Sequence, residues 1–191
     1  MRTIRRGVFE SNSSSTHSIA IPKNCDETNY ISFHIGEFGW EWEEADPADY
    51  FYTAIYTTSE TKSEVEEKLK TLKDILDSHN IEYHFGNAET HIYVYDDHCY
   101  LSLDNGYIDH GSALTDFVNE LLNDGDKLVR FLSRGLVFTG NDNSYTEERC
   151  FVERDTEYLD DYDWGTKTKS KIKNPYYMTD HNDYDWYWKG N

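Results

Sequence analysis

The best-defined element of the fold is predicted by residues 63–76, Ser-Glu-Val-Glu-Glu-Lys-Leu-Lys-Thr-Leu-Lys-Asp-Ile-Leu. Its apolar residues recur at the spacing of one helix face. They are Val65, Leu69, Leu72, Ile75 and Leu76. Ser63 and Glu66 have the spacing of a capping box, so we expect the helix to begin at Ser63. The stretch predicts an amphipathic helix that packs its apolar face against a core.

Signals on either side of this helix indicate further helices and strands. Asp46-Pro47 supplies an N-cap and a first-turn proline for a helix upstream, and we expect Ser112 to cap a helix downstream. Short apolar runs elsewhere in the chain predict β-strands, among them 30–35, 81–85, 91–95, 99–103 and 136–138. Asp104-Asn105-Gly106 is typical of a hairpin turn and predicts that the segments flanking it pair.

The pattern as a whole predicts an α+β fold. We expect residues 1–154 to form a single domain with a mixed or antiparallel sheet and two or three packed helices. Residues 155–191 are rich in Asp, Tyr, Trp and Lys and show no clear periodicity. This aromatic, acidic C-terminal extension is expected to pack partly on the domain, since aromatic residues are unusual in disordered tails.

The charge of the chain restricts its partners. Its 191 residues include 37 acids and 18 bases, which give a formal net charge of −19. Phosphate would be repelled, so autonomous binding to duplex DNA is not expected. A basic nucleoprotein is a suitable partner, although acidity that serves only solubility is an open alternative. The three scattered cysteines and the lack of a leader or membrane-spanning run predict a cytoplasmic protein with no membrane contact.

One stretch concentrates the negative charge. The segment Glu37–Asp49 holds six acids and no base, and we expect it to be exposed because unpaired carboxylates are costly to bury. Four of its side chains are candidates for binding a basic partner. They are Glu37, Glu41, Glu43 and Glu44.

The segment Phe-Glu-Ser-Asn-Ser-Ser-Ser-Thr-His-Ser, residues 9–18, is the strongest candidate for chemistry. Glu10 and His17 can transfer protons, and hydroxyl, amide and guanidinium groups can bind phosphate. The candidate phosphate-binding residues here are Arg5, Arg6, Asn12, Ser13, Ser14 and Ser15. A solvated loop is the open alternative, because Ser, Thr and Asn are favoured wherever backbone groups need local partners.

A second polar segment, Asp109-His110-Gly111-Ser112, stands at an expected helix start. His110 is a candidate acid or base and Ser112 a candidate phosphate ligand, although Ser112 could be only a cap. A third segment, Gly140–Ser144, has the composition of an ordinary turn, and a part in a polar pocket is the open alternative. If these segments meet residues 9–18, His17 and His110 could cleave RNA without a metal. We predict no metal and no cofactor, since the sequence has no standard zinc, P-loop or dinucleotide-binding motif.

The opening Arg-Arg-Gly-Val-Phe-Glu-Ser-Asn-Ser-Ser-Ser-Thr-His-Ser resembles a family of small proteins of Firmicutes phages and prophages. A looser likeness includes Asp109-His110-Gly111-Ser112 and Thr139-Gly140-Asn141-Asp142. In length, acidity and helix–sheet pattern the chain is also similar to some phage anti-CRISPR proteins of type II. Such inhibitors bind the RNA-guided nuclease or shorten its guide RNA, so the resemblance implies one of these behaviours.

The leading hypothesis is therefore a phage counter-defence protein in the cytoplasm of a bacterial host. It would inhibit a type II CRISPR effector by binding its basic nucleic-acid channel, with or without cleavage of the guide RNA as a metal-independent ribonuclease. Two alternatives remain open at the level of sequence. One is a phosphodiester or phosphotransfer enzyme that acts on nucleotides, and the other is a non-catalytic acidic module that mimics DNA.

Overall fold

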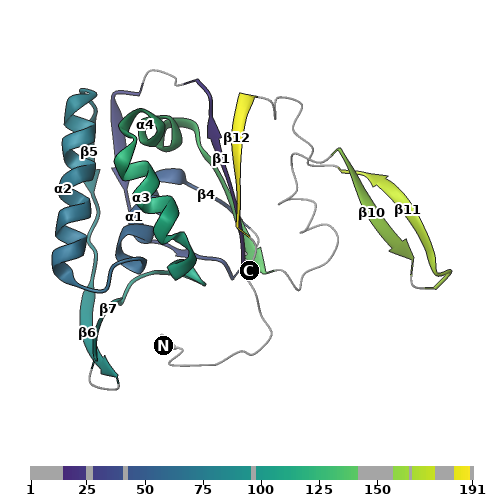
Figure 1. The fold of residues 1–191 in the computed structure, drawn as a ribbon, viewed down its shortest axis with the longest axis horizontal. Helices are drawn as coiled ribbons and strands as arrows, with labels where there is room; N and C mark the ends of the chain where they lie inside the picture. The colour runs from purple at the N-terminus through teal and green to yellow at the C-terminus, as the bar shows by residue number, and fades with distance from the viewer. Residues whose placement is uncertain are drawn as a thin grey trace.

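A computed structural model gives the fold of the chain (Figure 1). The structure describes residues 15–24, 28–40, 43–95, 98–141, 157–163, 165–174 and 183–189.

The main sheet has four antiparallel strands in the order β12-β1-β9-β4. They span Tyr184–Lys189, Ser15–Pro22, Leu136–Asn141 and Glu43–Ala45. Strand β1 is central, because β12 pairs along one edge and β9 along the other. Its residues Ile19 and Ile21 are buried, which places this strand in the middle of the domain.

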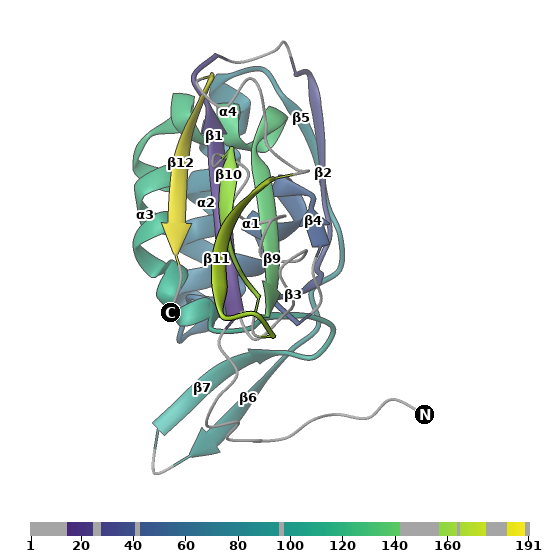
Figure 2. The same ribbon diagram turned by 90° about the vertical axis from the view of Figure 1, so that its right-hand side faces the viewer.

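Helices cover one face of this sheet (Figures 1 and 2). The described helices are α1 (Pro47–Thr57), α2 (Lys62–Ser78), the 3₁₀ turn η1 (Gly111–Leu114), α3 (Thr115–Asn123) and α4 (Gly125–Arg134). Phe51 of α1, Phe117 of α3 and Phe131 of α4 meet edge to face in the core between them. None of the described helices is long and apolar enough to cross a membrane.

Four strand pairs lie outside the main sheet. β2 (Tyr30–Phe33) pairs in parallel with β5 (Glu82–Phe85), and β3 (Glu37–Phe38) pairs in parallel with β8 (Tyr107–Ile108). β6 (Thr90–Tyr95) and β7 (His98–Leu103) form an antiparallel hairpin, as do β10 (Tyr158–Asp163) and β11 (Thr168–Lys173). The antiparallel main sheet, the separate strand pairs and the packed helices make this an α+β fold, as predicted, with four described α-helices rather than the expected two or three.

The predicted helix starts are confirmed in one case and corrected in two. The Asp46 side chain accepts from the amides of Ala48 and Asp49 and caps α1, as expected. In α2 the cap is Thr61 rather than Ser63, and Thr61 Oγ1 accepts from the amide of Glu64. Ser112 caps no helix, because it lies inside η1 and α3 begins only at Thr115.

The turn prediction at Asp104-Asn105-Gly106 is wrong. These residues lead from β7 to β8, but β7 pairs with β6 and β8 pairs with β3. Asn105 instead bridges neighbouring loops, since its side chain accepts from the amide of Glu89 and donates to the carbonyl of Asn87. A sequence that permits a tight turn does not by itself select the strand that pairs.

The C-terminal extension contributes to the main sheet. Strand β12 pairs with β1 over its full length, from His17↔Lys189 to Pro22↔Tyr184. The ring of Tyr184 is buried, whereas Tyr158 of the β10–β11 hairpin is about half exposed. Part of the extension thus completes the domain.

Candidate functional site

The predicted residue His17 lies in the centre of the main sheet. It is on β1, between β9 and β12, and only 3% of its surface is exposed. Ser15, two residues earlier on the same strand, is buried as well. A polar side chain in such a place needs hydrogen-bond partners, because an unpaired buried polar group is costly.

Both ring nitrogens of His17 have partners. Nε2 is 2.9 Å from the carbonyl oxygen of Asp109 and 3.1 Å from Ser15 Oγ, and Nδ1 is 3.0 Å from the hydroxyl of Tyr50. A carbonyl only accepts, so Nε2 carries the proton and Nδ1 accepts from Tyr50. The Ser15 hydroxyl donates to the same Asp109 carbonyl at 3.1 Å.

The side chains of His17 and Tyr50 are both held in their neutral forms. Burial lowers the pKa of His17, and the nearby His110 lowers it further, although the Asp109 carbonyl and carboxylate oppose the shift. Burial also raises the pKa of Tyr50 well above its usual value, so this phenol remains a donor. A neutral imidazole that accepts from a protonated phenol is the expected state.

Gly39 allows the Asp109 segment to approach His17. Its backbone has φ +101°, and an added Cβ would lie 3.0 Å from Asp109 Cβ and 3.3 Å from His17 Cε1. Its amide donates to Thr139 Oγ1 on β9 at 3.1 Å. The amide of Asp109 in turn donates to the carbonyl of Phe38 at 2.9 Å. Sequence analysis missed Gly39, since a single glycine shows no partner in the sequence.

The structure brings together the described parts of all three predicted polar segments. Ser15 and His17 contact the Asp109 carbonyl, and Gly140 and Asn141 on β9 pair with Thr16 and Ser15 on β1. His110 itself has φ 53° and its side chain is about half exposed, with Nε2 4.0 Å from Asp109 Oδ2. Ser112 is exposed. The remaining predicted site residues before β1 lie outside the described part of the chain. They are Arg5, Arg6, Glu10, Asn12, Ser13 and Ser14.

The predicted acidic contact residues occupy different environments. Glu37 on β3 and Glu44 on β4 are exposed, whereas Glu43 is half-buried and accepts from Thr139 Oγ1 at 3.4 Å. Glu41 lies outside the described residues. Two other acids of this stretch have structural roles, since Asp46 caps α1 and Asp49 binds His34.

This geometry favours a structural role for His17. A general base needs a free lone pair that faces the substrate, and the Nδ1 lone pair is already used by a buried phenol. In the described part of the chain, no group of three or more His, Cys, Asp or Glu side chains is arranged to hold a metal ion.

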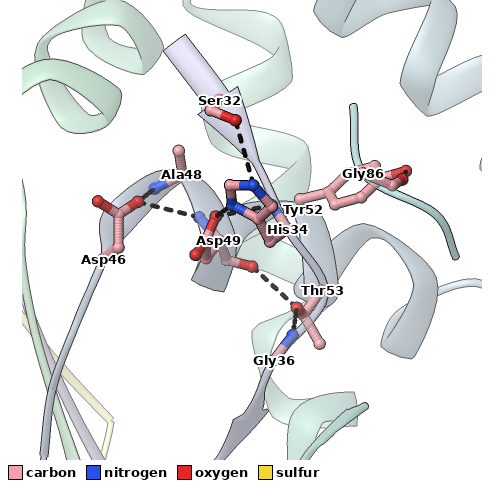
Figure 3. Close-up of polar contacts among 9 residues, drawn as sticks. All are labelled: Ser32, His34, Gly36, Asp46, Ala48, Asp49, Tyr52, Thr53 and Gly86. Carbon is pink, nitrogen blue, oxygen red and sulfur yellow. Dashed lines mark hydrogen bonds and ion pairs between the residues drawn. The ribbon is translucent and has the colours of Figure 1, made fainter. Parts of the chain in front are cut away.

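A second polar cluster, which sequence analysis missed, lies on the surface beside α1 (Figure 3). His34 Nδ1 is 3.1 Å from Asp49 Oδ1, and His34 Nε2 is 3.3 Å from Ser32 Oγ. His34 is 60% exposed and Asp49 28% exposed, so solvent reaches both side chains. The spacing Ser-x-His on a strand was the available signal, because alternate residues share a face.

The chain matches no protein-family model, no curated protein and no solved structure.

Proposed function

We propose that this chain is a phage counter-defence protein that binds a type II CRISPR RNA-guided nuclease and blocks its basic nucleic-acid channel. The observation that carries the proposal is the β6–β7 hairpin, which extends from the body (Figures 1 and 2) with Ile92, Tyr93 and Val94 exposed by 56%, 46% and 68%. Consecutive exposed apolar residues on a projecting element are typical of a contact surface.

The hairpin has internal contacts that hold it ready for binding. Tyr93 of β6 stacks on Tyr100 of β7, with ring centroids 5.4 Å apart and planes at 25°. His91 Nδ1 is 2.6 Å from Asp104 Oδ1, which ties β6 to the loop after β7. At the base, the amide of Leu101 donates to the carbonyl of Glu60. A preorganised surface loses less conformational entropy when it binds.

Charge supports the choice of partner. A protein of net charge −19 repels free nucleic acid and is attracted to a basic channel. The phage part of the proposal rests on the resemblance of the N-terminal sequence, and the CRISPR part on the less specific likeness in length, acidity and helix–sheet pattern. Binding is preferred to guide cleavage, because His17 would have to give up a buried hydrogen bond to act on RNA.

The test is a pull-down of a guide-loaded type II nuclease with the wild-type chain and with an Ile92→Ser, Val94→Ser double variant. We expect the double variant to bind at least about 10-fold more weakly, because exposed apolar anchors contribute most of the binding free energy. Tyr158→Ser is the matched control, since Tyr158 is 49% exposed on the other hairpin. Equal capture of all three proteins would contradict the proposed contact surface.

Guide RNA recovered from the same samples separates the alternatives. A full-length guide together with inhibition of DNA cleavage supports binding alone. A guide shortened by the wild-type chain would support the ribonuclease hypothesis. Absence of capture, with turnover of free nucleotides, would support the nucleotide enzyme instead.

A further inference from the structure

The cluster at Ser32, His34 and Asp49 has the order of a nucleophile, a base and an orienting carboxylate. Ser32 lies on β2 and His34 follows the strand, so both side chains project from the same face. Figure 3 shows the imidazole of His34 between the other two groups. Hydroxyl, imidazole and carboxylate are joined by contacts of 3.3 and 3.1 Å.

The tautomer of His34 suits a general base. Asp49 accepts the Nδ1 proton, so the Nε2 lone pair faces the hydroxyl of Ser32. A second set of serine, histidine and carboxylate, formed by Ser78, His79 and Asp126, has no lone pair available on its histidine. His79 donates from Nδ1 to the carbonyl of Ile75 and from Nε2 to Asp126, which leaves no lone pair for Ser78.

The surrounding backbone fixes the carboxylate and the ring. Asp49 Oδ1 also accepts from the amide of His34 at 2.7 Å. Thr53 Oγ1 donates to the Asp49 carbonyl at 2.8 Å and accepts from the amide of Gly36 at 3.1 Å, which ties α1 to the segment after β2. A Cβ on Gly86 would lie 3.4 Å from His34 Cδ2, so the backbone there backs the ring.

The backbone of β2 also offers a donor for a developing oxyanion. The carbonyls of Asn29 and Phe33 accept from Glu82 and Gly86 at the two ends of the β2–β5 ladder. Successive residues of a strand direct their amides to opposite edges, so the Ser32 amide points away from β5. The His34 amide points the same way, and it donates to Asp49. The amide of the nucleophilic residue itself is an established kind of oxyanion donor.

A surface hollow begins at Tyr30, further along β2 from this serine. It measures about 530 Å³ and is lined by Tyr30, Asp77, Asn80, Ile81, Glu82 and Tyr83. Tyr30 is two residues before Ser32 on the same face of β2, a separation of about 7 Å. Aromatic rings with two carboxylates suit an apolar group that is neutral or positively charged.

We propose that Ser32 and His34 are the catalytic residues of a serine esterase site, that Asp49 is its positioning residue, and that its substrates are carboxylic esters with a neutral or cationic group. Ser32 Oγ forms a bond to the ester carbonyl carbon while its proton passes to His34 Nε2. The carbon–oxygen bond to the alcohol then breaks, and the alcohol leaves with that proton. Water then gives a proton to His34 Nε2 and attacks the acyl carbon. The bond from that carbon to Ser32 Oγ breaks, Ser32 Oγ takes the proton back from His34, and the carboxylic acid leaves. This site is independent of the proposed binding function.

The test uses the full chain with p-nitrophenyl acetate and with a choline ester, and follows release of acid and acetylation by mass spectrometry. Wild type should carry one acetyl group on the peptide that contains Ser32. Ser32→Ala and His34→Gln should lower the rate by at least about 100-fold. Asp49→Asn should lower the acylation rate with little change in KM, a split that a merely structural role would not produce.

Ser78→Ala is the matched control, because Ser78 has a histidine neighbour without a free lone pair, and it should keep the wild-type rate. An unchanged melting temperature for Ser32→Ala shows that the fold persists in that variant. Equal rates for wild type and Ser32→Ala, or acetylation elsewhere than Ser32, would overturn the proposal. Faster turnover of an anionic ester than of the choline ester would overturn the assignment of substrate charge.

Discussion

His17 shows what a single residue contributes when it lies between two neighbouring strands. Its imidazole links β1 to the hydroxyl of Tyr50 on α1 and to the carbonyl of Asp109 after β8. These contacts join three segments distant in sequence, so the side chain acts as a polar link through an apolar core. Sequence showed an unusual histidine, but only the pairing of β3 with β8 places Asp109 beside it.

The link between Tyr50 and His17 gives a prediction for stability. Tyr50→Phe keeps the ring and removes the donor to His17 Nδ1, which leaves a buried acceptor without a partner. We expect a loss of about 1–3 kcal/mol in the free energy of unfolding, measured in urea. Tyr30→Phe is the control, because Tyr30 is 54% exposed, and it should change stability by less than about 0.5 kcal/mol. Equal stability of the two variants would mean that the Tyr50 bond is unimportant.

Two histidines should give stability opposite dependences on pH. Burial lowers the pKa of His17 below 6.5, so its contribution is complete above pH 6.5 and is lost as the pH falls through the lowered value. The bond to Asp126 raises the pKa of His79 above 6.5, so its contribution is complete below pH 6.5 and is lost as the pH rises through the raised value. The free energy of unfolding, measured in urea from about pH 5 to 8, should therefore change less with pH on the acid side in His17→Gln. In His79→Gln it should change less with pH on the alkaline side. Parallel profiles for wild type and both variants would contradict these assignments.

At the scale of elements, helix α2 was predictable because its signals are local. The apolar spacing predicted the helix itself. Thr61 caps it two residues before the predicted cap, and the Glu64 carboxylate accepts from the amide of Glu60 rather than from that of the cap residue. The predicted position of a helix cap is wrong by a few residues where several Ser, Thr and Glu residues lie close together in the sequence. Strand pairing was not predictable in the same way, because β8 pairs with β3 and β12 with β1 across long stretches of chain.

The two candidate sites follow the same rule. The meeting of Ser15–His17 with Asp109–His110 was a conditional expectation, and the structure brings these segments together. The Ser32–His34 spacing was visible in the sequence as alternation on a strand. Its connection to Asp49 depends on the packing of α1 against β2, which no local pattern specifies.

Unequal burial along α2 refines what its apolar stripe contributes. Leu72 is fully buried, whereas Leu69, predicted to be equally buried, is only partly so. Leu72→Ala should cost about 2–5 kcal/mol, and Leu69→Ala clearly less, since it removes fewer core contacts. Thermal unfolding of the two variants provides the measurement. A larger loss for Leu69→Ala would mean that the helix presents a different face to the core.

At the scale of the whole molecule, we expect the net charge to affect the rate of association with a partner more than the details of the fold do. The net charge of −19 should accelerate association with a basic nucleoprotein and make it sensitive to salt, with negligible binding to free duplex DNA. A filter-binding experiment with duplex DNA at physiological salt checks the last point. Tight binding there would contradict the inference drawn from charge.

The acidic stretch around β3 and β4 allows local and global charge to be separated. Glu37→Lys with Glu44→Lys reverses two exposed acids of that stretch, and Glu66→Lys with Glu67→Lys reverses two exposed acids on α2. Both double variants change the net charge equally. If the stretch faces the partner, the first should slow association with the captured nuclease several-fold more than the second, with a smaller change in dissociation, because steering charges act mainly on the on-rate. Stopped-flow measurements at low and high salt provide the comparison. Equal slowing by both variants would mean that only the net charge affects association, and not the position of the acids. No slowing by either variant would mean that electrostatic steering plays no part in the proposed binding.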